Sequence, residues 1–454
     1  MELGKGSEFV ANGVRSDQTN VQVDGINNTN PRDSTAEAAP PLDALQEFKV
    51  QTSNYSAEFG RVAGPVINLS IKKGGNVLHG SLFEFVRNDL FDAGNYFDVP
   101  GTHSELRRNQ FGGTMGGPIY IPHIYNGHDK TFFLLSAESY RQVSGSNDIG
   151  IVPSLLERAG DFSQSFNTFT GVAFNTPVPS TTPGGQPTAP LPIYNPNTGS
   201  LLLANPNAKS SYYPNGYPSL LPASAFDPVA VKLMNQFYPL PTTGVTLPSG
   251  NNYIINEKAY SYWDNAVVKI DQQLAAHDEA SIKYLFRHEH TTKPFAGSDT
   301  GQWGAILHNL QTIVAFNETH IFTPNLINDF RSGLTRNVNN EQPFDMGIDW
   351  GALLGLNGGT TNPALEDFPN FNVSGYETLG DSTQEPITYT SNNYDTNDSL
   401  TWSHGKHTLK FGGDMLKVQY FQPTNSEFSG DIGFSGRATQ GKPATTSTAQ
   451  NGFP

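Results

Sequence analysis

The chain of 454 residues is 36% hydrophobic and 11% aromatic, with 45 glycines and 32 prolines, which suits strands, turns and long loops better than a helical bundle. Its net charge of −15 argues against a general affinity for nucleic acid, whose phosphates would repel it. The absence of cysteine excludes disulfides, thiolate metal sites and a cysteine nucleophile.

The first 75 residues differ in character from the rest of the chain. They are rich in Gly, Asn and Asp, predict one short strand at 48–52 and suggest a second at 66–71. We interpret residues 1–75 as a small mixed domain. No apolar stretch follows the charges at the N-terminus, so no signal peptide is expected there, and no window approaches the roughly 20 apolar residues of a membrane-spanning helix.

From residue 76 onward, segments alternate apolar and polar side chains with the period of two that places them on opposite faces of a strand. In 263–271 the apolar face carries Ala266, Val268 and Ile270, and the polar face carries Asn265, Lys269 and Asp271. In 280–287 the apolar face carries Ile282, Tyr284 and Phe286, and the polar face carries Ser281, Lys283 and Arg287. Nine strands are predicted in all, at 80–87, 109–120, 130–141, 263–271, 280–287, 311–321, 326–336, 394–403 and 407–419.

The connections between these strands alternate in length. The shorter ones are 121–129, 274–278, 322–325 and 404–406, and the long ones are 88–108, 142–260, 288–310 and 337–393. A transmembrane barrel has tight turns at its periplasmic rim and long loops outside, whereas a soluble β-sandwich has no reason to alternate in this way. The pattern therefore predicts antiparallel strands of an outer-membrane barrel. Nine strands should not close the barrel, and the last strand would present an open edge.

Aromatic and basic side chains fit the same interpretation. Aromatic residues near strand ends are candidates for interfacial girdles, although β-propensity alone also favours them: Tyr120, Phe132, Tyr140, Tyr260, Tyr262, Trp263, Tyr394 and Trp402. Charge on the lipid face costs about 2–4 kcal/mol for Arg or Lys at the bilayer midplane, so basic residues should face the lumen or the N-terminal domain. The candidates are Arg61, Lys72, Arg87, Arg107, Arg108, Lys269, Lys283 and Arg287.

No enzyme site is predicted. The triplet His288-Glu289-His290 offers good metal ligands, but no third ligand is identifiable, and zinc sites need three or four from the protein. His123 and His128 flank a turn and are interpreted, like the triplet, as solvated residues. The sequence contains no GxSxG, HExxH or P-loop motif. We therefore expect no catalytic residue, no cofactor and no metal site.

Short motifs occur in a characteristic order along the chain. They are VDG at 23–25, LDALQEFKV at 42–50, SAEFGR at 56–61, VINLSIKKGG at 66–75, HGSLFEF at 79–85, RNQFGG at 108–113, GGP at 116–118, KTFF at 130–133, RAGDFS at 158–163 and KHTLKFGG at 406–413. Together they resemble the TonB-dependent outer-membrane receptors, in particular their Oar-like branch. Pro65 departs from the pattern, which usually has a second Gly there. The motif residues of the receptor plug would be Asp24, Gly25, Glu58, Gly60, Arg61, Gly64, Asn68 and Lys72.

This resemblance implies a plug lodged in a 22-stranded barrel of the bacterial outer membrane. Residues 1–75 would be the C-terminal part of the plug, a small α/β remnant, and residues 76–454 the first part of an incomplete barrel. Such receptors capture a scarce ligand at the cell surface, and an energy-transducing TonB contact then rearranges the plug. The segment that contacts TonB, an N-terminal extension and the remaining strands are not recognised in this sequence, which is therefore expected to be a fragment or part of a split gene.

The implied function is a receptor and transporter whose partners are a TonB-type complex, an extracellular ligand captured by loops such as 142–260, and outer-membrane lipid. One alternative is a non-transporting surface protein on the same barrel, acting in adhesion, secretion or envelope organisation. A third interpretation is a secreted carbohydrate-binding β-sandwich, which would show no alternation of short and long connections. No loop carries a recognisable code for a particular ligand.

Overall fold

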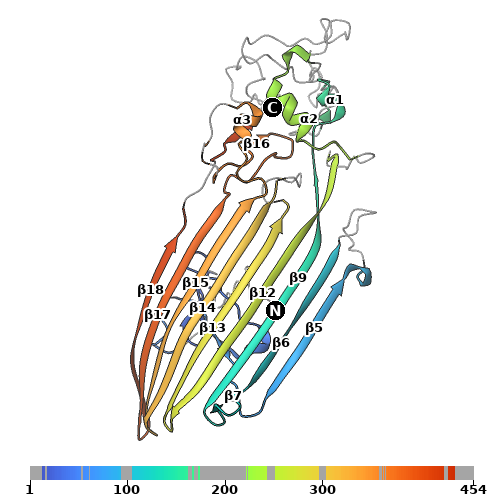
Figure 1. Ribbon diagram of the computed structural model, residues 1–454. Helices are drawn as coiled ribbons and strands as arrows, with labels where there is room; N and C mark the ends of the chain where they lie inside the picture. The colour runs from blue at the N-terminus through green and yellow to red at the C-terminus, as the bar shows by residue number, and fades with distance from the viewer. Residues whose placement is uncertain are drawn as a thin grey trace, which may run out of the picture.

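The computed structural model describes residues 13–15, 18–52, 55–60, 62–93, 105–161, 166–167, 172–173, 221, 223–242, 251–295, 303–356, 360, 362, 364–423 and 428–434. Two sheets organise these residues: a long antiparallel sheet of nine strands, called here the wall sheet, and a sheet of four short strands near the N-terminus, called the N-terminal sheet. In Figure 1 the wall sheet is the row of long, tilted strands, with folded loops above one end.

All nine predicted strands are present in the wall sheet. They are β5 (His79–Asn88), β6 (Leu106–Pro118), β9 (Thr131–Gly150), β12 (Tyr253–Ala275), β13 (Asp278–Lys293), β14 (Ala305–Thr323), β15 (Leu326–Pro343), β17 (Ile387–His404) and β18 (His407–Phe421). Each pairs antiparallel with its sequence neighbour, so the spatial order is β18-β17-β15-β14-β13-β12-β9-β6-β5. The strands β5 and β18 form the two edges, and the sheet is not closed.

The strands are longer than predicted at the end that carries the long connections. The predicted loop 142–260 is replaced by a connection over 151–252, because β9 continues to Gly150 and β12 already begins at Tyr253. The other long connections also shorten, to 89–105, 294–304 and 344–386. These strand ends are rich in Asn, Ser, Thr and Glu, so they lack the apolar alternation on which the prediction depended. The alternation of short and long connections itself is confirmed.

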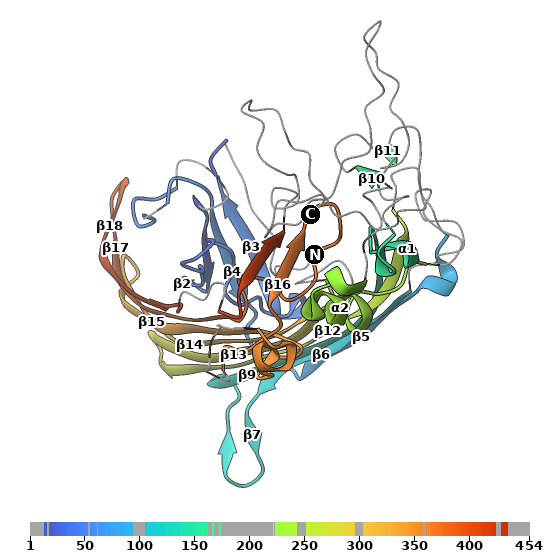
Figure 2. The same ribbon diagram turned by 90° about the horizontal axis from the view of Figure 1, so that it is seen from above.

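The wall sheet curves so that one face is concave and the other convex (Figure 2). Side chains alternate between them as predicted: Asn265, Lys269 and Asp271 are buried, whereas Val268 and Ile270 are exposed. Exposed apolar residues of the same phase continue across neighbouring strands at Ile282, Tyr284, Leu310, Val314, Phe316 and Tyr394. An apolar convex face, with most of the polar side chains on the concave face, is what a barrel wall in lipid requires. A soluble β-sandwich would expose polar side chains on its outer face instead.

The N-terminal sheet lies on the concave side of the wall sheet (Figure 2). It consists of β1 (Asn20–Val23), β2 (Ile26–Asn27), β3 (Leu45–Gln51) and β4 (Val66–Ile71), in the order β2-β1-β4-β3. The strands predicted at 48–52 and 66–71 are thus confirmed, and two further strands are added. An apolar core joins the two sheets, with Val23, Ile26, Ile67 and Leu69 on one side and Leu134, Val267, Leu285 and Ile313 on the other.

The long connections above the wall sheet build a cap with its own core. The cap contains α1 (Leu155–Arg158), α2 (Pro228–Gln236), α3 (Trp350–Leu354) and the 3-10 turn η4 (Ala223–Ala225). The 3-10 turns η2 (Leu42–Ala44) and η3 (Asp89–Phe91) lie elsewhere, η2 before β3 and η3 after β5. The short strands of the cap region are β10 (Phe166–Asn167), β11 (Val172–Ala173), β16 (Asn370–Val373) and β19 (Asp431–Phe434). The strands β7 (Tyr120–Ile121) and β8 (Tyr125–Asn126) form a hairpin at the opposite end of the wall sheet (Figure 1). In the described part of the chain no helix is long and apolar enough to cross a membrane.

Candidate functional site

The tight turn between β1 and β2 brings three residues of the predicted plug motif together. Asp24 has φ 48° and Gly25 has φ 80°, a conformation that glycine adopts readily and that aspartate tolerates better than most residues. The Asp24 amide donates to Leu69 O at 2.8 Å, and the Gly25 amide donates to Asn68 Oδ1 at 3.2 Å. These two hydrogen bonds join residues that are separated by 45 and 43 positions in the sequence, and fix them at one corner of the N-terminal sheet.

The Asp24 carboxylate connects this corner to the wall sheet. Its Oδ1 accepts from the Ile71 amide at 2.8 Å, and its Oδ2 lies 2.7 Å from Lys283 Nζ. Lys283 also donates to Val23 O at 3.0 Å. The side chains of Lys283 and Asp24 are only 3% and 11% exposed, so this is a buried ion pair whose charges are satisfied by further hydrogen bonds.

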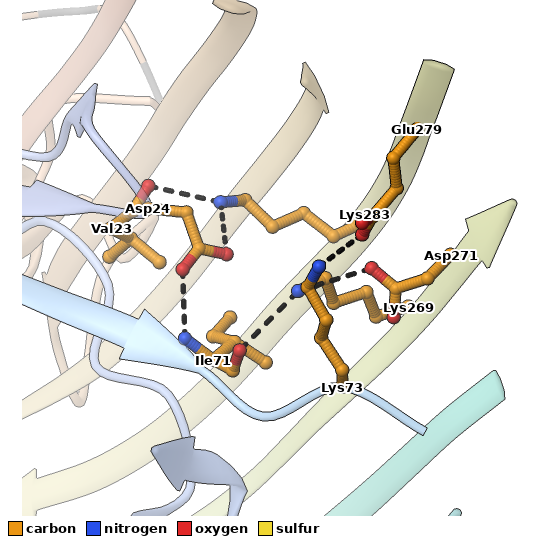
Figure 3. A network of polar contacts seen from close by, with 8 residues as sticks. All are labelled: Val23, Asp24, Ile71, Lys73, Lys269, Asp271, Glu279 and Lys283. Carbon is orange, nitrogen blue, oxygen red and sulfur yellow. Dashed lines mark hydrogen bonds and ion pairs between the residues drawn. The ribbon is translucent and has the colours of Figure 1, made fainter. Parts of the chain in front are cut away.

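A second lysine of the wall sheet approaches the same corner. Lys269 Nζ donates to Ile71 O at 3.3 Å and lies 3.5 Å from Asp271 Oδ1. Figure 3 shows both lysines reaching from their strands toward the N-terminal sheet, beside the more exposed ion pair of Lys73 and Glu279. The expectation that basic residues face inward is confirmed for Lys269, Lys283 and Arg287, which are buried on the concave face.

Several wall-sheet side chains bind the backbone of the N-terminal segment. Asn265 Nδ2 donates to Ala39 O at 2.6 Å, Thr335 Oγ1 to Asn27 O at 2.7 Å, and Asn393 Nδ2 to Thr29 O at 2.9 Å. In the reverse direction the Asn27 amide donates to Asp395 Oδ2 at 2.7 Å. Polar side chains of the wall therefore satisfy backbone groups that would otherwise be buried without partners.

Glu37 is the most deeply buried acid of the N-terminal segment, with 1% of its surface exposed. Its carboxylate accepts hydrogen bonds from Asn337 and Ser391 of the wall sheet. Burial raises the pKa of Glu37 to about 7, against the lowering effect of these two donors. No sequence pattern marks Glu37, because its two donors lie 300 and 354 residues further along the chain.

The remaining motif residues have different surroundings. Lys72 Nζ donates to Asp43 O at 2.7 Å, and Glu58 forms an ion pair with Lys410 of β18. A Cβ on Gly64 would lie 2.4 Å from Gln18 O, whereas a Cβ on Gly60 would meet nothing within 4 Å. Packing therefore requires glycine at 64 and not at 60. Arg61 lies outside the described residues.

The other basic residues singled out in the sequence lie near the β5 edge. Arg87 pairs with Asp92, and Arg107 pairs with Glu105. Arg108 donates from Nε to Gln142 at 2.8 Å and lies over the Tyr140 ring. These residues do not contact the N-terminal sheet in the described part of the chain.

The aromatic residues predicted to form girdles fall into an exposed group, for which the girdle stays a prediction, and a buried group. Tyr260, Tyr394 and Trp402 are exposed on the wall sheet. Trp263 and Tyr140 are buried instead, and their rings stack with centroids 5.2 Å apart. Arg287 lies 4.3 Å from the Trp263 ring centroid, so these two aromatic residues anchor an inward cation and do not belong to a girdle.

The cap contains an aromatic core and a group of buried acids. Trp303 and Phe368 are almost fully buried with ring centroids 3.9 Å apart, and Trp350 packs edge-on against both. Burial raises the pKa of Asp367 to about 6. Burial and the neighbouring Asp345 carboxyl raise the pKa of Asp381 well above its usual range. Much of the loop expected to capture ligand, 142–260, lies outside the described residues.

The structure adds one histidine, His308, beside the triplet His288-Glu289-His290, which the sequence alone does not support as a metal site. His290 Nδ1 lies 3.3 Å from His308 Nδ1 on the adjacent strand, and the ring of His288 stacks 6.5 Å from that of His308. Glu289 points the other way, toward Arg287. The triplet alone could not reveal this neighbour, because it lies on the paired strand β14. His123, with φ 64°, precedes the short strand β8, and His128 follows it.

Comparisons with known proteins agree with this architecture. A profile described as an outer membrane β-barrel domain matches residues 70–453. The TonB-dependent transporter Oar of Myxococcus xanthus is 30% identical over 116 residues, which cover 24% of this chain and 11% of that protein.

The solved structures to which the chain is similar include three outer-membrane proteins. The transporter YddB of Escherichia coli superposes with a TM-score of 0.46 at 11% identity, over 90% of this chain and 41% of that one. The ferric-catecholate import receptor Fiu of E. coli gives 0.35 at 13% identity, over 95% and 58%. The ferric enterobactin receptor of Pseudomonas aeruginosa gives 0.31 at 12% identity, over 89% and 51%. The chain thus spans less than two thirds of the length of each of these proteins.

Proposed function

Because the chain belongs to the family of outer-membrane β-barrel domains, we propose that it is part of a TonB-dependent transporter that captures a ligand at the cell surface and admits it to the periplasm. In this proposal residues 1–75 are the C-terminal part of the plug, and residues 76–454 are the first part of the barrel. The chain connection from Ile71 at the end of β4 to His79 at the start of β5 supports a boundary there.

The observation that carries the proposal is the way the N-terminal sheet is held against the wall sheet. A plug has to be held firmly at rest and released when ligand passes. Hydrogen bonds suit this task, since water can replace them at a modest net cost of about 0.5–1.5 kcal/mol between neutral groups and about 1.5–3 kcal/mol where one group is charged. The Asp24–Lys283 pair and the contacts from Asn265, Thr335 and Asn393 are of this kind.

The motif residues have a consistent role in this proposal. Asp24, Gly25 and Asn68 shape the corner that Lys283 engages, and Gly64 permits the close approach of the backbone at Gln18. Lys72 ties β4 to the segment before β3, and Glu58 reaches β18 through Lys410. A TonB-type complex would supply the force that disrupts these contacts. The cap would present the ligand-binding surface, and the convex apolar face would contact outer-membrane lipid.

The test compares cells carrying the gene with a deletion strain. Labelled ferric siderophores, oligosaccharides and peptides are offered with and without a protonophore, and accumulation in the periplasm is measured. Uptake that requires both the gene and the proton gradient supports a transporter. Surface binding of a ligand without uptake contradicts the proposal and favours a non-transporting surface protein acting in adhesion, secretion or envelope organisation.

A cross-link tests the role of the plug directly. The chain has no cysteine, so Asp24→Cys with Lys283→Cys can be joined by a cleavable bifunctional reagent. Cells that carry the cross-linked protein should bind the ligand but not take it up, and cleavage of the linker should restore uptake. The matched control treats the two single variants with the same reagent. Uptake that persists through the linked protein would show that this corner need not move.

A further inference from the structure

A group of metal-ligating side chains lies at the opposite face of the wall sheet from the interface described above. Asp278 opens β13, directly opposite His320 of β14, and Glu318 lies two residues before His320 on the same face. Val314 and Phe316, in phase with Glu318 and His320, are exposed on the convex face. The three residues therefore face outward, near the start of β13 and the end of β14, where the wall sheet carries its short turns. These strand ends lie at the bottom of the wall sheet in Figure 1.

The geometry of the group is close to that of a coordination site. One ligand atom from each of Asp278, Glu318 and His320 lies within 4.8 Å of the other two. Donors bound to tetrahedral zinc at about 2.0–2.1 Å lie roughly 3.3 Å apart, so small side-chain rotations suffice to enclose an ion. The backbones of β13 and β14 are held in register by their ladder, which fixes where the three side chains start.

The charges near the group favour a cation. Two carboxylates lie close together, and like charges at this distance repel one another. The cross-strand neighbours on this face are Ala280 and Phe330 beside Glu318, and Asn328 beside His320, none of which is basic. His320 contacts the Asp278 carboxylate through Nδ1. A protonated His320 would offset one negative charge, and a divalent cation would offset both.

We propose that Asp278, Glu318 and His320 form a binding site for a divalent transition-metal ion of the Zn²⁺ type, with the remaining coordination position open to water. Calcium and magnesium prefer shells made of oxygen alone, whereas one imidazole with two carboxylates is a donor set that zinc accepts. The ion would join β13 to β14 next to their turns and stabilise the folded chain by mass action. This site is independent of the proposed transport function.

The site can be tested with the full chain folded in detergent micelles and stripped of metal. Calorimetric titration with ZnCl₂ should show one site, and Co²⁺ should give visible absorption bands of the intensity expected for four-coordinate ligation. His320→Gln and Glu318→Gln should each weaken Zn²⁺ binding by about 100-fold or more, because loss of a ligand should exceed the 10–100-fold effect of losing a residue behind the ligands. Circular dichroism should show that both variants fold.

A matched control separates this site from the other histidine group on the same strand. His308→Gln changes the pair formed by His290 and His308 at the far end of β14 and should leave the affinity for Zn²⁺ at the proposed site unchanged. Unchanged binding in His320→Gln, or loss of binding in His308→Gln instead, would overturn the proposal. Wild-type protein that shows no Co²⁺ bands and no Zn²⁺ titration would overturn it as well, and would leave His320 as an ordinary ion-pair partner of Asp278.

Discussion

Removal of the Lys283 charge should loosen the N-terminal sheet from the wall. Lys283→Met replaces the side chain by an unbranched apolar one that is a single atom shorter, and leaves the Asp24 carboxylate, which is 11% exposed, without its cation. Breaking a buried pair in this way costs about 3–5 kcal/mol, because the remaining charge stays buried without compensation. The matched control is Lys73→Met, whose partner Glu279 is 37% exposed, and its expected cost is about 0.2–1 kcal/mol.

The population of the loosened state can be measured by limited proteolysis. When opening is fast, the rate of cleavage within residues 18–52 follows the equilibrium population of the open form. A loss of 3–5 kcal/mol corresponds to roughly two to three and a half powers of ten in that population. Asp24→Asn combined with Lys283→Met should recover part of the loss, since no unpaired charge then remains. If Lys283→Met and Lys73→Met accelerate cleavage equally, the buried pair does not hold the N-terminal sheet.

Three further changes test other parts of the structure. Stability contributed by neutral Glu37 is complete below pH 4.5 and is lost as pH rises through about 7. In urea titrations Glu37→Gln should therefore match wild type in acid and exceed its free energy of unfolding by roughly 3 kcal/mol above pH 7. Equal stabilities across this range would contradict the burial argument. Gly64→Ala should lower the thermal midpoint because its Cβ meets Gln18 O, whereas Gly60→Ala should be neutral; equal midpoints would refute this reasoning. Phe368→Ala should cost the cap about 3–5 kcal/mol, seen as faster proteolysis of the segment 344–386 with the wall intact.

The central parts of the wall strands could be predicted because a half-buried strand has a period that a single sequence displays. Asn265, Lys269 and Asp271 alternate with Val268 and Ile270 whatever the partner strands are, and the structure places them accordingly. The strand ends could not be predicted, since above the apolar band both faces are polar and no alternation remains. The strands β1 and β2 were missed because they have four and two residues, too few to establish a period.

Only part of the candidate site could be predicted from the sequence. The Asp24-Gly25 dipeptide predicts a turn, and Lys283 was expected to face inward. Their contact could not be predicted, because the two residues are 259 positions apart in the sequence. Glu37 carries no local signal, because its raised pKa arises from burial against strands remote in sequence. The raised pKa of Asp381 arises from burial and from the Asp345 carboxyl within the same connection, which no short motif displays. Trp263 was misassigned for a different reason: it shares the strand phase of Asn265 and Lys269, so alternation alone places it on the concave face, where it lies beside Arg287.

The direction of the hydrogen bonds across the concave face has an evolutionary consequence. Lys269, Lys283, Asn265, Thr335 and Asn393 all donate to main-chain carbonyls, which every amino acid possesses. Substitutions in the N-terminal segment can therefore accumulate without loss of these contacts, provided that the path of the backbone is preserved. The wall sheet therefore binds the backbone path of the N-terminal segment more than its side chains. The N-terminal segment and the wall sheet can then diverge in sequence at different rates.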